Sequence, residues 1–415
     1  MSKRCCIVFV FLVFCELGFA ADWATWLGPN RDGKSMETGL LKSWPAGGPK
    51  SAWKVKGLGE GYSSMAIVGN RIYTLGQKGN QQFVLALDTA TGRQVWKTPA
   101  GNAFIGEQGG GPRSMPQVEG NRLYALASDG TLVCLEAETG RRIWGFNYTE
   151  KFGSPIPRWA FCESPLIDGN RLVIAPGGHN SAIVALDKAT GAVIWQSGDS
   201  EAGYSSVLAF DFEGHRIYTV LTNSAAIGMD ARNGSLLWSY EKAVNQFANI
   251  ATPVYADGYV FYSSDYGNGS ALLKLTVEGG AVKATEAYFT SQMQNDYATS
   301  IKIGDYLYGF SGYEVGILTA MEFKTSKVAW KERRAEKGSC ILADGLLYCQ
   351  GEDGDVQLID PSPARYNEIS RFEIQRPPTH MTYVPNGNMW SVPAVANGRL
   401  YIRDQDNLYA YDIKH

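Results

Sequence analysis

The chain has 415 residues and a formal net charge of −3; 45% of the residues are hydrophobic and 47 are glycine. It contains no basic run, so we expect no nucleic-acid partner. A chain of this length exceeds what one ordinary core serves, and it must form several domains or one architecture of repeated units. The many glycines favour short strands that are joined by tight turns.

The first 20 residues have the layout of a secretory signal peptide. Two basic residues precede an apolar run over residues 5–15, and Ala20 ends a candidate cleavage site. The run is too short to cross a membrane, and no later stretch approaches roughly 20 apolar residues. We therefore predict residues 1–20 as a signal peptide, a periplasmic or secreted protein, and no transmembrane segment. The alternatives are a buried first strand and lipid attachment at Cys15, against which the bulky Phe14 argues.

Residues 21–50 are rich in glycine and proline, and we expect them to form an arm that lies on the rest of the protein. The next segment, residues 51–55, reads as a single strand that precedes the repeated units.

A short signature then recurs eight times: a turn dipeptide, one residue, a branched aliphatic residue and usually an aromatic residue. Asn-Gly and Asp-Gly accept the positive φ angles of two-residue turns, so each copy marks a hairpin. The copies begin at Gly69, Gly120, Gly169, Gly214, Asp257, Gly304, Asp344 and Asn397.

A second signature, variants of Asp-x-x-Thr-Gly followed by a tryptophan, comes after most copies. Each unit therefore holds two hairpins, and four strands are the content of one propeller blade. The spacing of about 40–53 residues also suits a blade. Because the tryptophans recur at one place, we expect them to wedge between adjacent blades. They are Trp96, Trp144, Trp195, Trp238 and, in a weaker form of the signature, Trp330.

The eighth unit ends without its tryptophan strand. The strand at residues 51–55 can supply it, which joins the two ends of the chain and leaves no open sheet edge. We therefore predict an all-β fold: an eight-bladed β-propeller of four-stranded blades over residues 51–415, closed by an N-terminal strand that completes the last blade.

The Asp-x-x-Thr-Gly-x-x-x-Trp pattern resembles the tryptophan-docking motif of PQQ-dependent alcohol dehydrogenases, and residues 22–33 resemble the opening of exported bacterial PQQ-like propellers. The resemblance covers essentially the whole mature chain and implies the fold. It fixes no activity, because propellers host many functions. The lipoprotein propeller of the outer-membrane β-barrel assembly machinery shares the repeat and is a scaffold.

Candidate site residues stand just before the inner strands, at the mouth of the central channel. A ring of carboxylates, amides and cations there can hold a polar ligand, and an ordinary solvated rim is the alternative. The ring comprises Glu60, Tyr62, Glu107, Arg113, Arg158, Glu163, Glu201, Tyr204, Asn249, Asn295, Asp296, Lys337, Asn388 and Trp390.

The dehydrogenase resemblance implies a site for PQQ and Ca²⁺, a hard cation that prefers oxygen ligands. Asp296 matches the position of the base that takes the alcohol proton, and Asn268 with Asp296 matches the metal ligands. The candidate cofactor-contacting residues are Arg113, Asn180, Asn268, Lys337 and Trp390.

The sequence departs from that family at several positions. The adjacent cysteines of the family fall near Glu107, its stacking tryptophan falls at Ser224, and a second arginine is missing near Glu314. Asn180 replaces a glutamate ligand, so the metal site would lose one full negative charge and the cation would be under-neutralised. We therefore expect no cofactor, with PQQ and calcium as the alternative.

Three functional hypotheses follow. The first is a non-catalytic exported propeller that serves as a binding or scaffold protein for a protein, a glycan or a small polar ligand at the channel mouth. The second is a PQQ- and calcium-dependent alcohol or polyol dehydrogenase, and the third is unrelated chemistry at the channel mouth.

Two cysteines flank the turn Asp344-Gly345. Counting outward from this turn places Cys340 opposite Cys349 at a non-hydrogen-bonded pair, where Cα atoms lie about 4.5 Å apart. That separation is near the lower limit for a disulfide. We predict a disulfide, with free neighbouring thiols as the alternative.

Overall fold

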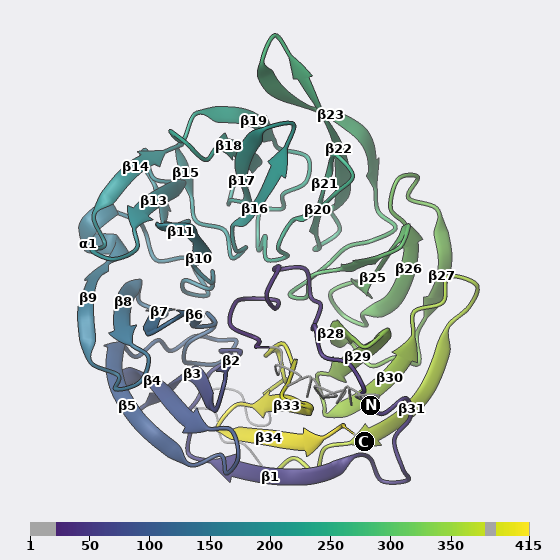
Figure 1. Cartoon of the computed structure of the whole chain (residues 1–415). Coiled ribbons are helices and arrows are strands. Elements are labelled where there is room, and N and C mark those ends of the chain that lie inside the picture. Colours follow the sequence, from purple (N-terminus) through teal and green to yellow (C-terminus); the bar gives the residue numbers. More distant parts are fainter. Residues whose placement is uncertain (1–21, 378–386, 415) are drawn as a thin grey trace, which may run out of the picture.

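The computed structural model describes residues 22–377 and 387–414. The predicted signal peptide, with Cys15 and the cleavage site at Ala20, lies outside the described residues. Eight four-stranded antiparallel sheets are arranged around a central axis like the blades of a propeller (Figure 1). The predicted all-β, eight-bladed propeller is confirmed. Among the described residues, no helix is long and apolar enough to cross a membrane.

The first four blades follow the chain from the inside of the ring to the outside. Blade 1 consists of β2 (Ala66–Val68), β3 (Arg71–Lys78), β4 (Gln81–Asp88) and β5 (Gln94–Asn102). Blade 2 consists of β6 (Gln117–Glu119), β7 (Arg122–Leu126), β8 (Thr131–Glu136) and β9 (Arg142–Asn147). Blade 3 consists of β10 (Leu166–Asp168), β11 (Arg171–Ile174), β13 (Ile183–Asp187) and β14 (Val193–Ser197). Blade 4 consists of β16 (Leu208–Phe212), β17 (His215–Leu221), β18 (Ala226–Asp230) and β19 (Leu236–Tyr240).

The next three blades repeat this order. Blade 5 consists of β20 (Val254–Ala256), β21 (Tyr259–Ser264), β22 (Gly269–Glu278) and β23 (Ala281–Thr290), and its outer hairpin projects beyond the ring in Figure 1. Blade 6 consists of β24 (Ile301–Ile303), β25 (Tyr306–Ser311), β26 (Ile317–Glu322) and β27 (Val328–Glu332). Blade 7 consists of β28 (Gly338–Ala343), β29 (Leu346–Gly351), β30 (Asp355–Asp360) and β31 (Asn367–Glu373).

Blade 8 combines both ends of the described chain. Its sheet runs in the order β1 (Lys50–Lys56), β34 (Asn407–Asp412), β33 (Arg399–Asp404) and β32 (Ala394–Ala396). Strand β1 pairs antiparallel with β34, with Trp53 opposite Ala410. The predicted closure by an N-terminal strand is therefore confirmed. The remaining elements are short: a helix, α1 (Tyr148–Phe152), and a small sheet of β12 (Gly177–Gly178) and β15 (Ser200–Glu201).

The turn dipeptides read from the sequence adopt the expected backbone. Asp257, Asp344 and Asn397 have φ angles of 53°, 47° and 56°, in the left-handed region that Asn and Asp tolerate. The turn at Asp344 sets the register of β28 and β29, in which Cys340 lies opposite Cys349. These two residues form a disulfide with their Cα atoms 4.1 Å apart, as predicted.

The recurring tryptophans join each blade to the next. In five of the six tryptophans the indole N–H donates to a carbonyl in a turn of the following blade, and the expected wedge between blades is confirmed. The hydrogen bonds are Trp53 to Thr89 at 2.9 Å, Trp96 to Ala137 at 3.0 Å, Trp144 to Lys188 at 3.2 Å, Trp195 to Ala231 at 3.1 Å and Trp330 to Ser362 at 2.9 Å. Trp238 differs, because its indole donates to the hydroxyl of Tyr262 at 3.0 Å.

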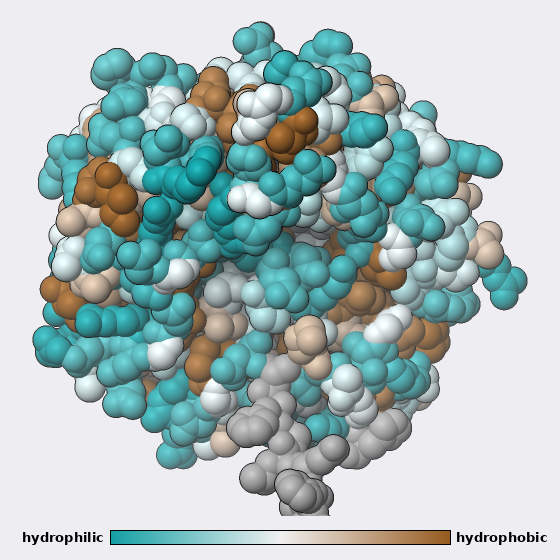
Figure 2. Space-filling view, turned by 45° about the horizontal axis from the view of Figure 1, so that its top comes forward, coloured by the Kyte–Doolittle hydropathy of each residue, from teal (hydrophilic) through white to brown (hydrophobic). Residues whose placement is uncertain are grey.

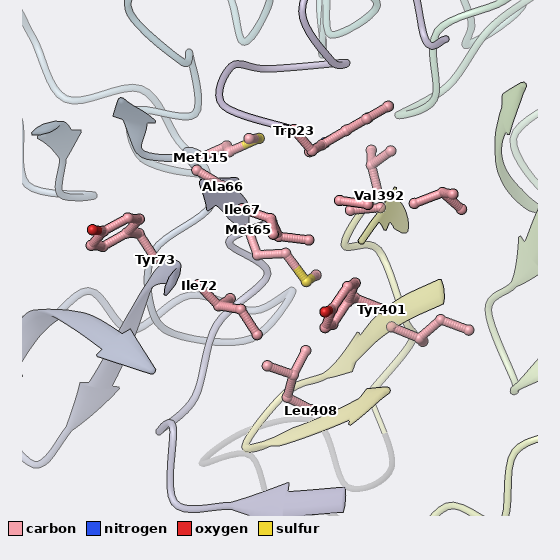
Figure 3. Close-up of a cluster of buried hydrophobic side chains, with 14 of the residues drawn as sticks. Trp23, Met65, Ala66, Ile67, Ile72, Tyr73, Met115, Val392, Tyr401 and Leu408 are labelled. Carbon is pink, nitrogen blue, oxygen red and sulfur yellow. The ribbon is translucent and has the colours of Figure 1, made fainter. Parts of the chain in front are cut away.

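A large hydrophobic cluster lies where blade 8 meets blade 1, beneath the arm (Figure 3). Trp23, Ile67 and Leu408 are each at most 1% exposed. The buried guanidinium of Arg403 crosses the same junction and donates to the carbonyl of Ser63 at 3.0 Å and to the hydroxyl of Thr74 at 2.6 Å. Apolar burial and satisfied hydrogen bonds together hold the ring closed.

Residues 22–49 form an arm that crosses the centre of the ring, drawn in purple in Figure 1. Trp23 pairs through its backbone with Ile67 of blade 1, and Ser35 donates its backbone N–H to Leu342 of blade 7. The side chain of Arg31 donates to the carbonyls of Ser164 at 2.9 Å and Pro165 at 3.0 Å, next to blade 3. The arm therefore contacts distant blades and covers one end of the central channel.

Candidate functional site

A cavity of about 710 Å³ opens at the other end of the channel, where the chain enters the inner strands. Ligand pockets typically have volumes of about 300–1,000 Å³. Its lining is unusually aromatic, and nine aromatic side chains contribute to it: Trp26, Tyr62, Trp159, Tyr204, Phe247, Tyr266, Tyr297, Tyr313 and Trp390. We call this cavity the mouth cavity.

One wall of the mouth cavity is built around Lys337, which precedes β28. Its ammonium lies 2.7 Å from a carboxylate oxygen of Asp296 and 3.6 Å from one of Glu352. It also donates to the carbonyl of Tyr313 at 2.6 Å, and it lies within 5.4 Å of the ring centres of Tyr297 and Tyr313. The cation is thus surrounded by carboxylates and aromatic faces.

Glu352 links this cluster to the aromatic residues of blade 8. Its carboxylate accepts hydrogen bonds from the indole of Trp390 at 2.8 Å and from the amide of Asn388 at 3.0 Å. The ring of Trp390 packs against Tyr62, with 4.9 Å between ring centroids, and against Tyr297, with 5.9 Å. Because its polar edge is held by Glu352, the indole has a fixed orientation in the cavity wall.

A second wall comes from blades 2 and 3. Arg158 lies over the ring of Trp159 and pairs with the carboxylate of Glu107 at 2.5 Å. Arg113 donates to the carbonyls of Gly111 and Gly109 at 2.9 and 3.0 Å. Its guanidinium is therefore fixed by backbone acceptors.

Burial shifts the pKa of two acidic groups in the first wall and of Asp265, which lies next to the lining residue Tyr266. Burial raises the pKa of Asp296 and of Glu352, while the neighbouring Lys337 opposes both shifts. Burial and the charge of Asp296 raise the pKa of Asp265 to about 6. The site therefore concentrates negative charge in a place of low solvent access, where charge is costly without a partner.

The structure brings most of the predicted mouth residues together. The following predicted residues line the cavity: Tyr62, Glu107, Arg113, Arg158, Tyr204, Asp296, Lys337, Asn388 and Trp390. The others lie elsewhere. Glu163, Asn249 and Asn295 are buried and hydrogen-bonded within and between blades, where they support loops. Glu60 and Glu201 lie outside the lining.

Of the six residues named for PQQ and calcium, Arg113, Asp296, Lys337 and Trp390 line the mouth cavity, whereas Asn180 and Asn268 do not. Asn180 has a φ of 51° in a turn and donates its backbone N–H to Asp199 at 2.8 Å, away from the cavity lining. The amide of Asn268 donates to Ser264 and to Lys242, and it too lies outside the lining. The carboxylate of Asp296 already holds an ammonium.

Within residues 22–377 and 387–414, no group of three or more His, Cys, Asp and Glu side chains is placed to hold a metal ion. Calcium needs several oxygen ligands at one point. The residues present therefore do not fit PQQ with calcium as the dehydrogenase resemblance would place them.

Several lining residues were not singled out from the sequence. They are Trp26 of the arm, the loop aromatics Trp159, Phe247, Tyr266, Tyr297 and Tyr313, and the acidic residues Glu314 and Glu352. The loop residues do not recur with the repeat. Their only signal was position, since each precedes an inner strand or lies in the turn between the two middle strands of a blade.

Comparison with known proteins identifies the family to which this chain is similar. A family model described as outer membrane protein assembly factor BamB matches residues 44–153 and 80–332. BamB of Yersinia pestis is 20% identical over 262 residues, which cover 61% of this chain and 64% of that protein. The chain thus spans less than two thirds of that relative's length.

Two further matches agree on the fold. A quinoprotein ethanol dehydrogenase of Pseudomonas putida is 28% identical over 191 residues, which cover 41% of this chain and 27% of that protein. The crystal structure of BamB from Moraxella catarrhalis matches with a TM-score of 0.63 at 16% identity, over 88% of this chain and 98% of that one. The family match covers more than half of the chain, and the protein belongs to the PQQ-repeat β-propeller family described as outer membrane protein assembly factor BamB.

Proposed function

We propose that this protein acts outside the cytoplasm as a binding protein whose mouth cavity holds a short saccharide or a similar small polyol. The observation that carries the proposal is the combination of nine aromatic side chains with a buried carboxylate–ammonium cluster in one cavity of about 710 Å³. A sugar ring has apolar C–H faces and a polar edge of hydroxyl groups. Aromatic rings match the faces, and charged hydrogen-bonding groups match the edge.

The arrangement favours binding over catalysis. Asp296 is paired with Lys337, and Glu352 accepts hydrogen bonds from Trp390 and Asn388. Carboxylates that are held by internal donors are fixed in orientation, as a recognition site requires. A general base would have to give up such a partner to accept a proton.

Calorimetric titration of the full-length protein with maltotriose, cellotriose and N,N′,N″-triacetylchitotriose tests the proposal. We expect at least one of the three to bind, and Trp390→Ala to weaken its binding about tenfold, because the aromatic wall loses its central ring. Glu278→Gln, in the exposed hairpin of blade 5, is the control and should bind like the wild type. If none of the three sugars binds the wild type, the saccharide proposal is wrong.

A second candidate function is a scaffold role in outer-membrane protein assembly, which the family match over residues 44–153 and 80–332 favours. The face shown in Figure 2 is largely hydrophilic, with hydrophobic residues in separate groups. Expression of this protein in a bacterium that lacks its own BamB tests the role. Restored amounts of outer-membrane β-barrel proteins would support it, and unchanged low amounts would count against it.

A further inference from the structure

We infer that Trp26 of the arm is a ligand-contacting residue that forms the floor of the mouth cavity, and that the arm makes this cavity a blind pocket rather than a through-channel. The inference deepens the proposed function and rests on it for the nature of the ligand. The floor is thus supplied by the arm, which is not a blade.

Neighbouring arm residues line two different cavities. Trp26 lines the mouth cavity, whereas Leu27 and residues 30–34 line a second cavity of about 390 Å³ that also involves blades 4, 5 and 6. The backbone that joins Trp26 to Leu27 therefore lies between the two spaces. A ligand that enters at the mouth meets the arm before it reaches the second cavity.

The indole of Trp26 presents its ring to the mouth cavity because its polar edge is already occupied. Its Nε1–H donates to the hydroxyl of Thr252 at 2.9 Å, and its backbone N–H donates to the side chain of Gln117 at 3.0 Å. Thr252 precedes blade 5 and Gln117 begins blade 2, so the residue is held from two sides of the ring. Trp26 is half-buried, whereas Trp23, three residues earlier, is 1% exposed.

The floor is anchored by the segment that follows it. Arg31 is 6% exposed, and its guanidinium donates to Gln117 at 3.2 Å as well as to two carbonyls near blade 3. Trp26 and Arg31 therefore share the side-chain oxygen of Gln117. A floor that is fixed before the ligand arrives costs little ordering on binding, which favours affinity.

A packing role alone would also explain a buried arm tryptophan, and Trp44 provides the matched comparison. Trp44 belongs to the same arm and packs against Tyr348 and Phe372 of blade 7. It is 7% exposed and does not line the mouth cavity. If Trp26 only packs the arm, Trp26→Ala and Trp44→Ala should behave alike.

The first test titrates both variants with whichever of maltotriose, cellotriose and triacetylchitotriose binds the wild type. We expect Trp26→Ala to weaken binding at least tenfold and Trp26→Phe, which keeps a ring, to weaken it less. Trp44→Ala should lower the melting temperature and leave the dissociation constant within twofold. Equal affinity of Trp26→Ala and the wild type would overturn the inference.

The second test needs no ligand. Hydroxyl-radical footprinting of the full-length protein with peptide mapping should oxidise Trp26 in the free protein and spare Trp23 and Trp44. Protection of Trp26 in the free protein would show that its ring does not face an open cavity, and would also overturn the inference. Absence of sugar binding together with oxidation of Trp26 would instead contradict the saccharide proposal and leave the placement of the floor supported.

Discussion

The outer belt of the propeller, by which we mean the outer-strand tryptophans and the turns that they contact in the next blade, differs from the mouth of the channel in how its residues are distributed among the blades. In the belt, one contact recurs from blade to blade: an indole packs over the glycine of the next repeat and donates to a carbonyl of the same turn. The rings of Trp53, Trp96, Trp144 and Trp195 lie against Gly92, Gly140, Gly191 and Gly234 in this way. At the mouth, most blades contribute different side chains, although a tyrosine recurs at Tyr62 and Tyr204, before blades 1 and 4.

This difference separates stability from recognition. A residue that recurs from unit to unit makes the same contact in each of them, and in a ring this contact joins one blade to the next. A residue that appears once can differ in charge and shape without harm to the other junctions. We therefore expect substitutions in the belt to change the free energy of unfolding and substitutions at the mouth to change mainly what is bound.

The largest effect should come from breaking the belt at its closure. A chain that starts at residue 57 lacks the arm and β1, so β34 becomes an open edge and the buried side chains of Trp23, Leu27 and Leu40 are lost. We expect aggregation or a loss of roughly 5 kcal/mol or more of stability, because an unpaired edge strand invites association and several apolar side chains lose their burial.

Thermal melting and size-exclusion chromatography check this expectation. A chain that starts at residue 22 keeps the arm and β1 and serves as the control. A chain from residue 57 that stays monomeric and melts at the temperature of this control would show that ring closure does not depend on β1.

A smaller effect should come from a single belt glycine. Gly140 has a φ of 73°, and a Cβ there would lie 2.6 Å from both Trp96 and Thr98. Gly140→Ala must displace the docked indole, and we expect a loss of about 3 kcal/mol in urea unfolding. Gly120→Ala is the matched control, because Gly120 has a φ of 55° with no atom within 4 Å of a Cβ. Gly120→Ala should lower the unfolding free energy by about 1 kcal/mol, because alanine is strained at a positive φ.

If both variants lose the same unfolding free energy, the loss comes from the positive φ angle alone, and the contact between tryptophan and glycine contributes nothing. The pair thus measures how much of the belt's stability comes from the docking itself.

The belt could be predicted from the sequence because its residues recur. The turn dipeptides, the tryptophans and the missing outer strand of blade 8 together predicted the propeller and its closure. The register of Cys340 and Cys349 followed from one turn, because hairpin pairing is set by counting outward from it.

The mouth could be predicted only in part. Position before an inner strand identified Arg113, Asp296 and Lys337, but nothing in the sequence pairs Lys337 with Asp296, because residues 41 positions apart meet only through the ring. Tyr266 and Tyr313 come from irregular turns of different blades and face each other with 4.8 Å between ring centroids. The path of the arm depends on tertiary contacts, so the role of Trp26 carried no sequence signal.

The smallest effect should appear beside the mouth cavity, at the neighbour of the lining residue Tyr266, as a dependence of stability on pH. The pKa of Asp265 is raised from 3.8 to about 6 by burial and by the charge of Asp296. The folded protein therefore holds this proton more tightly than the unfolded chain does. The stabilising contribution is complete below pH 4 and is lost as the pH rises through 6.

Asp265→Asn keeps an acceptor for the backbone N–H of Tyr266, which the carboxylate accepts at 2.7 Å, and removes the charge. We expect the variant to be more stable than the wild type at pH 8, by about 1–2 kcal/mol after allowance for solvent screening, and equally stable at pH 4. Urea unfolding at the two pH values measures the difference. The exposed Asp305→Asn should shift stability by the same small amount at both pH values. If the difference in stability between Asp265→Asn and the wild type is the same at both pH values, the prediction is wrong. The charged form of Asp265 would then not destabilise the folded protein.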